Sequence, residues 1–331
     1  MKLAIVLQNR FKRLAIVRAD RVIDIELLLK TLASRRVPAA LRSAAGHFKK
    51  DLSAPVDMTA LLARGDGYLR NLDRAAAAVA SAPASALPKG LRTKRDGARF
   101  CAPIARPGKI VCVGRNYTEH AKEGGSAVTE QPILFLKAAT SVCDPGAAIV
   151  IPRDSTQTDY EAELAVVIGK TGKDIPIEQA ENYIAGYTLL NDVSERQMQK
   201  SDGQWFRAKS CDTFGPMGPW IVTRDEISDA GNLRISLTLD AQLMQDSNTS
   251  NLIFKIPFLI SYLSNSITWE AGDILSTGTP AGVGAYRTPP VFLAAGNVVS
   301  VTVEKIGTLT NPVRAAAESK SSSPSKSKPG K

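Results

Sequence analysis

The sequence predicts an α+β fold with more strand than helix. The chain has 331 residues, which at roughly 150 residues per domain suggests two unequal units. Beyond Cys101 it changes to many short β-branched runs separated by Gly and Pro, with few helical segments between them. We therefore expect a small N-terminal α/β domain at 1–80 and a strand-rich domain at 107–313.

The N-terminal domain is predicted to begin with a hairpin. LAIVLQ and LAIVRADRVIDI are strand-like runs joined by a turn. The basic character of this segment leaves a mitochondrial presequence as the alternative, but the two runs and Asp20 favour a folded hairpin. Helices are predicted at Ile25–Leu32, Ala39–Ala45 and Asp57–Ala80. An Ala-, Ser- and Pro-rich stretch followed by LRTKRDGAR predicts a linker at 81–106.

The larger domain contains seven clear strand signals. They are KIVCVG, PILFLK, AAIVIP, AELAVVIG, PWIVT, LRISLTLD and VVSVTVEKIG. Helices are predicted at Glu178–Ile184 and Asn251–Asn265. The last residues, 314–331, are polar, basic and of low complexity, and are expected to be disordered.

Composition excludes several classes of protein. No segment reaches the ~18 apolar residues of a membrane-spanning helix, so no membrane partner is expected. Four cysteines without a CxxC pair exclude zinc ribbons and indicate a reducing compartment. The cytoplasm is expected, with the mitochondrial matrix as the alternative for a eukaryotic source. Two histidines are too few for a His-rich metal centre, so any metal must have oxygen ligands. Neither GxGxxG nor a phosphate-binding loop motif is present.

The positive net charge is confined to the two ends of the chain. Residues 1–110 carry 22 Lys and Arg against 8 Asp and Glu, and residues 314–331 carry 5 against 1. Residues 111–313 carry 15 against 23. Because the N-terminal third has no basic helix with interleaved aromatic residues, a solvated basic face is favoured over nucleic-acid binding. The acidic middle segment could hold a hard cation.

Carboxylates in two segments could form a metal site. Side chains alternate along a strand, so Asp159, Glu161 and Glu163 should share one face, where they repel one another unless a cation neutralises them. A polar, solvent-facing strand edge would give the same pattern. Asp192 follows an apolar run and could be a ligand, or it could cap the polar segment that follows.

Two further segments contain residues suited to acid–base chemistry. His120 and Glu123 are three residues apart, so on a helix the carboxylate could orient the imidazole as a general base; a solvated surface histidine is the alternative. Lys209 lies among aromatic residues and is either partly desolvated or extended to solvent. The Gly-rich segment TGTPAGVG could hold an anion with its backbone N–H groups.

The order of these motifs resembles the fumarylacetoacetate hydrolase family. The series is GRNYTEHAKE, PILFLK, DYEAELAVVIGK, NDVSERQMQ, KSCDTFGPMGPW, MQDSNTSNLIF and TGTPAGVG, spanning about residues 107–313. The chain looks like a bacterial-type or domain-containing member with acylpyruvase-like chemistry. The resemblance implies a mixed β-roll of stacked sheets and a homodimer formed through the larger domain.

The resemblance also implies roles for individual residues. Glu161, Glu163 and Asp192 would bind Mg²⁺, with Mn²⁺ or Ca²⁺ as alternatives. His120, Glu123 and Lys209 would be catalytic. The residues expected to contact the substrate, a small 2-oxo or diketo acid, are Arg115, Tyr117, Arg196, Gln199 and Thr279.

The implied activity is hydrolysis of a carbon–carbon bond in a 2,4-diketo acid. An acylpyruvate or a diketo-deoxy sugar acid would give pyruvate and a carboxylic acid, with water activated by His120 and Glu123. An oxaloacetate tautomerase or decarboxylase with the same metal site is the alternative, and a non-catalytic metal-binding protein is a third hypothesis. Glu195 and Cys211 replace a smaller and an aromatic residue of the family pattern, which predicts a pocket of altered size.

Overall fold

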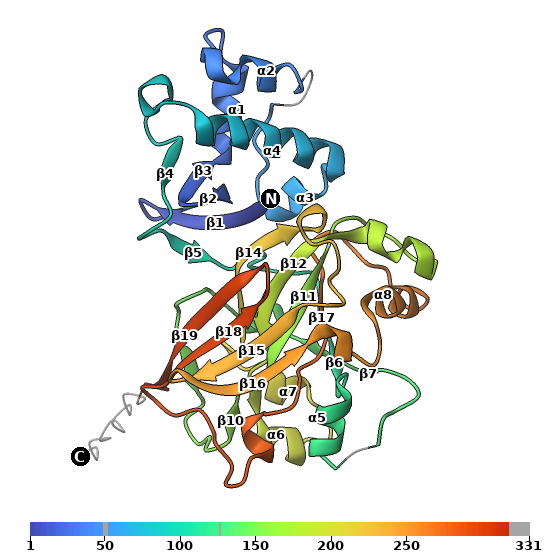
Figure 1. Cartoon of the computed structure of the whole chain (residues 1–331). Coiled ribbons are helices and arrows are strands. Elements are labelled where there is room, and N and C mark those ends of the chain that lie inside the picture. The colour runs from blue at the N-terminus through green and yellow to red at the C-terminus, as the bar shows by residue number, and fades with distance from the viewer. Residues whose placement is uncertain (49–51, 126, 318–331) are drawn as a thin grey trace, which may run out of the picture.

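The computed structural model describes residues 1–48, 52–125 and 127–317 (Figure 1). Most of the predicted tail, from residue 318 onward, lies outside the described residues. Strands dominate, as expected, and all seven predicted strand segments of the larger domain contain a strand. None of the helices in the described part of the chain combines the length and the apolar character needed to cross a bilayer.

The N-terminal region is a strand meander covered by helices. Strands β1 (Lys2–Gln8), β2 (Phe11–Arg18) and β3 (Arg21–Asp24) pair antiparallel, which confirms the predicted hairpin. Helix α1 (Ile25–Ala33) begins at Asp24, whose carboxylate accepts a hydrogen bond from the Leu27 N–H. A short helical segment follows at Ala39–Leu41 (η1) and Arg42–Ala45 (α2).

The predicted helix at Asp57–Ala80 is two helices. They are α3 (Met58–Leu62) and α4 (Gly65–Ser81). The break lies at Gly65, whose φ of 76° is in the left-handed region that a continuous helix excludes. The apolar residues of α4 face the strands, where Leu69, Leu72 and Val79 are buried.

The segment predicted as a linker, 81–106, contains two short strands. After the short turn η2 (Ala84–Ala86), β4 (Arg92–Lys94) pairs with β3, and β5 (Arg99–Cys101) pairs with β1. Short edge strands need few apolar residues, so the charged sequence LRTKRDGAR carries no strand signal and predicts a linker instead. The division of the chain into domains at these residues stays a prediction.

One large sheet runs through both parts of the molecule. Its order is β4-β3-β2-β1-β14-β12-β11-β17-β6-β7. Its further members are β6 (Ile110–Gly114), β7 (Ile133–Lys137), β11 (Ala162–Ile168), β12 (Ile184–Asn191), β14 (Gly215–Thr223) and β17 (Ile274–Ser276). The short β8 (Val142–Cys143) pairs with β14. The N-terminal strands join the rest through β1, which pairs antiparallel with β14.

A second sheet packs on the first. Its order is β16-β15-β18-β19-β9, formed by Gln242–Asn248, Arg234–Leu239, Val298–Val303, Gly307–Ala315 and Ile149–Ile151. Alternate residues of β11 contribute to two cores: Leu164 and Val166 pack with residues of the second sheet, whereas Ala165 and Val167 face the core that includes α1 and α4. Burial on both faces explains the continuous apolar run AELAVVI. The structure is therefore the stacked, mixed-sheet arrangement predicted.

The remaining helices are short. Helix α5 (Thr118–Glu123) follows β6, and α6 (Arg196–Ser201) and α7 (Phe206–Lys209) follow β12. The predicted helix at Glu178–Ile184 is a 3₁₀ helix, η4 (Ile177–Tyr183). The one at Asn251–Asn265 starts later, as α8 (Ile256–Ser264) with Pro257 in its first turn.

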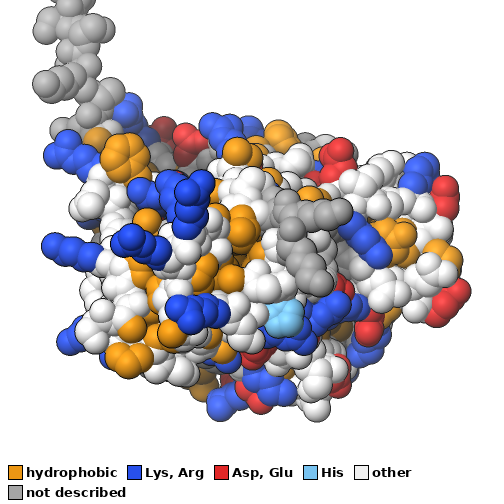
Figure 2. Space-filling model, turned by 90° about the horizontal axis from the view of Figure 1, so that it is seen from above, with side chains coloured by type: hydrophobic (Ala, Val, Ile, Leu, Met, Phe, Trp, Pro, Cys, Tyr) orange, Lys and Arg blue, Asp and Glu red, His pale blue; other side chains and the backbone are white. Residues whose placement is uncertain are grey.

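Figure 2 shows the face formed by the N-terminal region, seen from above. Lys and Arg side chains are scattered over it among apolar and uncharged side chains. Many of the N-terminal basic residues are exposed, and several pair with acids; Arg18, for example, lies 2.7 Å from Asp73. This arrangement supports a solvated basic face.

The turn between β15 and β16 predicts a stabilising substitution. Asp240 and Ala241 occupy it with φ values of 49° and 67°, and an alanine in this region is strained. We expect Ala241→Gly to stabilise the fold by about 1 kcal/mol, measured as a higher midpoint of thermal or urea unfolding. Ala77→Gly, inside α4, is the matched control and should destabilise by about 1 kcal/mol. Equal destabilisation by both would contradict the assignment of strain.

Candidate active site

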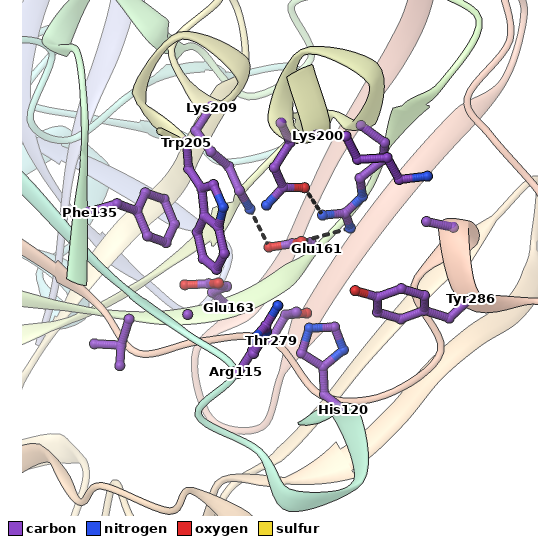
Figure 3. A pocket seen from close by; sticks show the side chains of 15 residues that line it. Arg115, His120, Phe135, Glu161, Glu163, Lys200, Trp205, Lys209, Thr279 and Tyr286 are labelled. Carbon is purple, nitrogen blue, oxygen red and sulfur yellow. Dashed lines mark hydrogen bonds and ion pairs between the residues drawn. The ribbon is translucent and has the colours of Figure 1, made fainter. Parts of the chain in front are cut away.

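A cavity of about 310 Å³ lies beside the end of the large sheet (Figure 3). Four parts of the chain line it: the β6–α5 segment, strands β7 and β11, helices α6 and α7, and the loop after β17. Trp205 and Phe135 form one wall, and Tyr286 stands opposite them. Eight of the eleven predicted site residues line this cavity: Arg115, His120, Glu161, Glu163, Arg196, Gln199, Lys209 and Thr279.

The three predicted metal ligands lie together. One carboxylate oxygen from each of Glu161, Glu163 and Asp192 lies within 4.8 Å of the others, and all three residues are buried. Strand pairing produces this cluster, because Ala162 on β11 stands opposite Asn191 on β12. The Asp192 N–H also donates to the Glu161 carbonyl at 2.9 Å. Pleating then directs Glu161 and Glu163 to one face.

Asp159 does not belong to this cluster, although it was predicted to share a face with it. Its carboxylate accepts hydrogen bonds from the backbone N–H groups of Tyr160, Gly284 and Ala285, and from Arg196 Nε at 2.8 Å. The strand is interrupted between Asp159 and Ala162, so the alternation used in the prediction does not extend back to Asp159.

Buried cations surround the carboxylates. Lys209 Nζ lies 2.7 Å from oxygens of both Glu161 and Asp192, and Lys137 Nζ lies 2.7 Å from the second oxygen of Asp192. Arg196 bridges Glu161 and Asp159. Lys209 is therefore buried in ion pairs, and the alternative of a lysine extended to solvent is wrong.

These contacts affect the carboxylates unequally. Burial alone would raise the pKa of Glu161, but the Lys209 ammonium and the Arg196 guanidinium hold it well below its usual range. Burial, together with the charges of Asp192 and Glu161, raises the pKa of Glu163 well above its usual range. Glu163 is therefore the carboxylate whose negative charge the surrounding protein neutralises least.

The cluster fits a divalent cation. Its donors are carboxylate oxygens, which hard cations such as Mg²⁺ and Mn²⁺ prefer. The Ser276 hydroxyl and the Gly278 N–H both donate to Glu163 Oε2, and they fix the carboxylate while leaving Oε1 without a hydrogen bond among the described residues. A bound cation would also neutralise the Glu163 carboxylate, which has no Lys or Arg ion-pair partner among the described residues.

His120 and Glu123 form a pair on α5. His120 Nδ1 lies 3.5 Å from Glu123 Oε2, and the histidine is buried, so a solvated surface histidine is excluded. The Gly282 N–H donates to both Glu123 oxygens at 3.1 Å and so fixes the carboxylate. Because Nδ1 faces Glu123, Nε2 is the nitrogen available to the cavity.

Tyr117 was predicted to contact the substrate, but it does not line the cavity. Its side chain is almost completely buried, and its backbone forms a β-bridge with Leu252. Burial raises the pKa of its hydroxyl, which has no hydrogen-bond partner among the described residues.

The predicted pocket-size changes at Glu195 and Cys211 also lack a structural basis in this cavity. Neither residue lines it, and Glu195 instead caps α6 by accepting a hydrogen bond from the Met198 N–H.

Sequence reasoning did not single out several residues of the site. They are Lys137, Phe135, Trp205, Lys200, Ala285 and Tyr286. For Lys137 a signal existed, because a lysine that ends the apolar strand PILFLK is costly to bury without a partner. For Lys200 the signal is its position four residues after Arg196 on the same short helix. Tyr286 reaches the cavity through tertiary packing and carries no local signal.

Comparisons with known proteins identify relatives of this chain. The oxaloacetate tautomerase fahd2, mitochondrial, of Xenopus laevis is 46% identical over 66% of this chain and 69% of its own length. The human oxaloacetate tautomerase FAHD2A, mitochondrial, is 41% identical over 80% of this chain and 81% of its own length.

Solved structures share the fold along nearly the whole chain. A fumarylacetoacetate hydrolase from Exiguobacterium antarcticum matches with a TM-score of 0.72 and 32% identity, covering 96% of this chain and all of its own. A maleylpyruvate hydrolase from Sphingobium sp. SYK-6, solved with manganese(II) and pyruvate, matches with a TM-score of 0.71 and 27% identity over the same shares.

The family model described as fumarylacetoacetate (FAA) hydrolase C-terminal matches residues 109–314, the part of the chain that contains the buried carboxylates and the histidine pair. The chain therefore belongs to the fumarylacetoacetate hydrolase family.

Proposed function

We propose that the protein is a divalent-metal-dependent enzyme that interconverts the enol and keto forms of oxaloacetate. The observation that carries this proposal is the cavity in which an acid–base pair, a buried lysine and a carboxylate cluster meet. The similarity to tautomerases from Xenopus laevis and human, which covers two thirds or more of each chain, supports oxaloacetate as the substrate.

The reaction moves one proton from the enol oxygen to carbon 3 and consumes no water. A divalent cation held by Glu161, Glu163 and Asp192 would act as a Lewis acid toward the carboxylate and 2-oxo oxygens. Arg196, Gln199 and Thr279 line the cavity beside this cluster and would orient the carboxylate end of the substrate.

The chain's own residues supply the proton transfer. His120 Nε2 would exchange the proton at carbon 3, and Glu123 would stabilise the imidazolium formed when His120 is protonated. Burial would lower the pKa of Lys209, but Asp192 and Glu161 raise it, so Lys209 stays an ammonium group and can offset negative charge on the 2-oxo oxygen.

Hydrolysis of an acylpyruvate is the second candidate. It was the first expectation from sequence, and the likeness to a maleylpyruvate hydrolase solved with manganese(II) and pyruvate favours it. In that reaction His120 would deprotonate water, and the carbon–carbon bond would break to give pyruvate and a carboxylic acid. The curated relatives give more support to the tautomerase.

Two accompanying expectations remain predictions. The names of the Xenopus laevis and human relatives include the word mitochondrial, which supports the mitochondrial alternative over the cytoplasm if the source is eukaryotic. The homodimer expected from the family resemblance can be measured by light scattering of the purified protein.

A product-resolved NMR assay tests the proposed function directly. With Mg²⁺ present, we expect the enol and keto signals of oxaloacetate to equilibrate faster with enzyme than without it, while acetylpyruvate and fumarylpyruvate stay intact. Formation of pyruvate and a free acid from a diketo compound would instead establish the hydrolase. Conversion of oxaloacetate to pyruvate and CO₂ at a rate that increases with enzyme concentration would indicate a decarboxylase.

Glu163→Gln tests the metal cluster. The substitution keeps the shape of the side chain but removes its charge, so we expect Mn²⁺ affinity to fall at least about tenfold in calorimetric titration. Glu119→Gln, an exposed carboxylate on α5 beside His120, is the matched control and should bind Mn²⁺ like the wild type. Unchanged affinity in Glu163→Gln would remove this residue from the site.

His120→Ala separates proton transfer from metal binding. We expect tautomerisation to slow by about 100-fold or more, which is the usual contribution of a general acid–base group. Mn²⁺ affinity should change less than about twofold, because His120 is not among the clustered ligands. A variant that retains wild-type rates would eliminate His120 as the proton carrier.

A further inference from the structure

We propose that Lys200 and Tyr286 bind the distal carboxylate of the substrate and so give the enzyme a preference for 2-oxo dicarboxylates over 2-oxo monocarboxylates. The inference depends on the proposed function only in taking the substrate to be a 2-oxo acid held in this cavity. Neither residue belongs to the set predicted from the family resemblance.

The charges around the cavity indicate a dianionic ligand. Asp159, Glu161, Glu163 and Asp192 carry four negative charges when ionised, and Lys137, Arg196 and Lys209 carry three positive charges in contact with them. A divalent cation in the cluster would therefore leave one positive charge in excess, which the Glu123 carboxylate beside His120 offsets. Arg115 and Lys200 add two more to the cavity lining, and neither forms an ion pair with a carboxylate in the part of the chain that the structure describes. A dianion offsets this excess better than a monoanion does.

Lys200 stands at a suitable distance along α6. It follows Arg196 by four residues, so both side chains lie on one face of the helix, and both line the cavity. One helical turn separates them by roughly 6 Å along the axis. This spacing is similar to the length of a four-carbon dicarboxylate, whose first carboxylate would lie near Arg196 and whose second would lie near Lys200.

Tyr286 supplies a neutral donor on the same cavity. Its hydroxyl points inward and forms no hydrogen bond with the described residues (Figure 3). Its ring lies 5.8 Å from that of His120. The preceding Gly284 and Ala285 N–H groups are held by Asp159 at 2.8 and 3.0 Å, and Asp159 also binds Arg196. Tyr286 is thus positioned relative to Arg196 before any ligand binds.

The opposite wall is mainly aromatic. Trp205 and Phe135 pack edge to face there, with ring centroids 5.3 Å apart. These rings can hold the carbon chain of a ligand but offer few hydrogen bonds to an anion. Arg115 lies against this wall, with its guanidinium 5.8 Å from the centroid of the Trp205 ring. We assign the distal carboxylate to the other side, where an ammonium group and a hydroxyl, those of Lys200 and Tyr286, can bind it together.

Binding of oxaloacetate and pyruvate to the Mn²⁺-loaded protein tests this inference, because the two acids differ by the distal carboxylate. Trp205 lines the cavity, so its fluorescence can report binding. Oxaloacetate is dissolved immediately before each titration. We expect the wild type to prefer oxaloacetate. Lys200→Met should reduce this preference about tenfold and Tyr286→Phe several-fold, with pyruvate affinity changed less than about twofold. Lys200→Arg should retain the preference, and the effect of Lys200→Met should shrink at high salt.

Lys122→Met is the charge control, because Lys122 is exposed on α5 and does not line the cavity. It should leave the preference unchanged. Two results would overturn the inference. One is a wild type that binds oxaloacetate and pyruvate equally well. The other is that Lys200→Met and Tyr286→Phe keep the full preference, or weaken the binding of pyruvate as much as that of oxaloacetate. A wild type that prefers oxaloacetate but does not tautomerise it would contradict the proposed function and leave this inference standing. Thermal unfolding confirms that each variant is folded.

Discussion

Burial of four carboxylates within one small region is the constraint on which the site depends. An isolated carboxylate in such a place would be too costly to ionise, so each needs a partner. Lys137, Lys209 and Arg196 supply three positive charges, and they come from three separate elements of the chain. Each of these contacts fixes the element that supplies it: the end of β7, helix α7 and the start of α6. The geometry of the cavity and the neutralisation of its acids are thus the same set of interactions.

This arrangement is compatible with both of the proposed reactions. The tautomerase and the hydrolase both need a positively charged environment for the 2-oxo oxygen and a base that faces the substrate carbon chain. In the proposed mechanisms, Lys209 and His120 would meet both needs. What separates the reactions is the atom that reaches His120, carbon 3 or a water molecule, and this depends on how the substrate is held. The choice between the two reactions therefore depends on the cavity residues that would hold the rest of the substrate as well as on those beside the carboxylate cluster.

Local sequence pattern predicted the strands and the hairpin, and it placed Glu161 with Glu163 and His120 with Glu123 on shared faces. The resemblance to the family, and not the local pattern, assigned these residues to a site. Side-chain alternation placed Glu161 and Glu163 correctly, because β11 is regular from Ala162 onward, and it failed at Asp159, where the strand is interrupted. Asp192 was ambiguous from sequence, and strand pairing with β11 decided its position. Lys137 and Lys200 were missed although each has a local signal: Lys137 ends an apolar strand, and Lys200 follows Arg196 by four residues on α6. Tyr286 was not found, because its proximity to the site arises from contacts between distant elements. The two strands in 81–106 were missed for a related reason: short edge strands are stabilised by their neighbours more than by their own composition.

The pairing of β1 with β14 has a consequence for truncated or recombined forms of this chain. The segment that matches the family model begins at residue 109, yet β14 lies inside that segment and has its outer edge covered by the N-terminal strand. Without this cover, β14 would expose a row of backbone donors and acceptors that another molecule could pair with. In this chain, the residues upstream of the matched segment therefore supply a strand that pairs with the sheet of that segment. Removal of the N-terminal region from this chain would expose that edge, and a replacement would have to provide a strand that pairs antiparallel with β14.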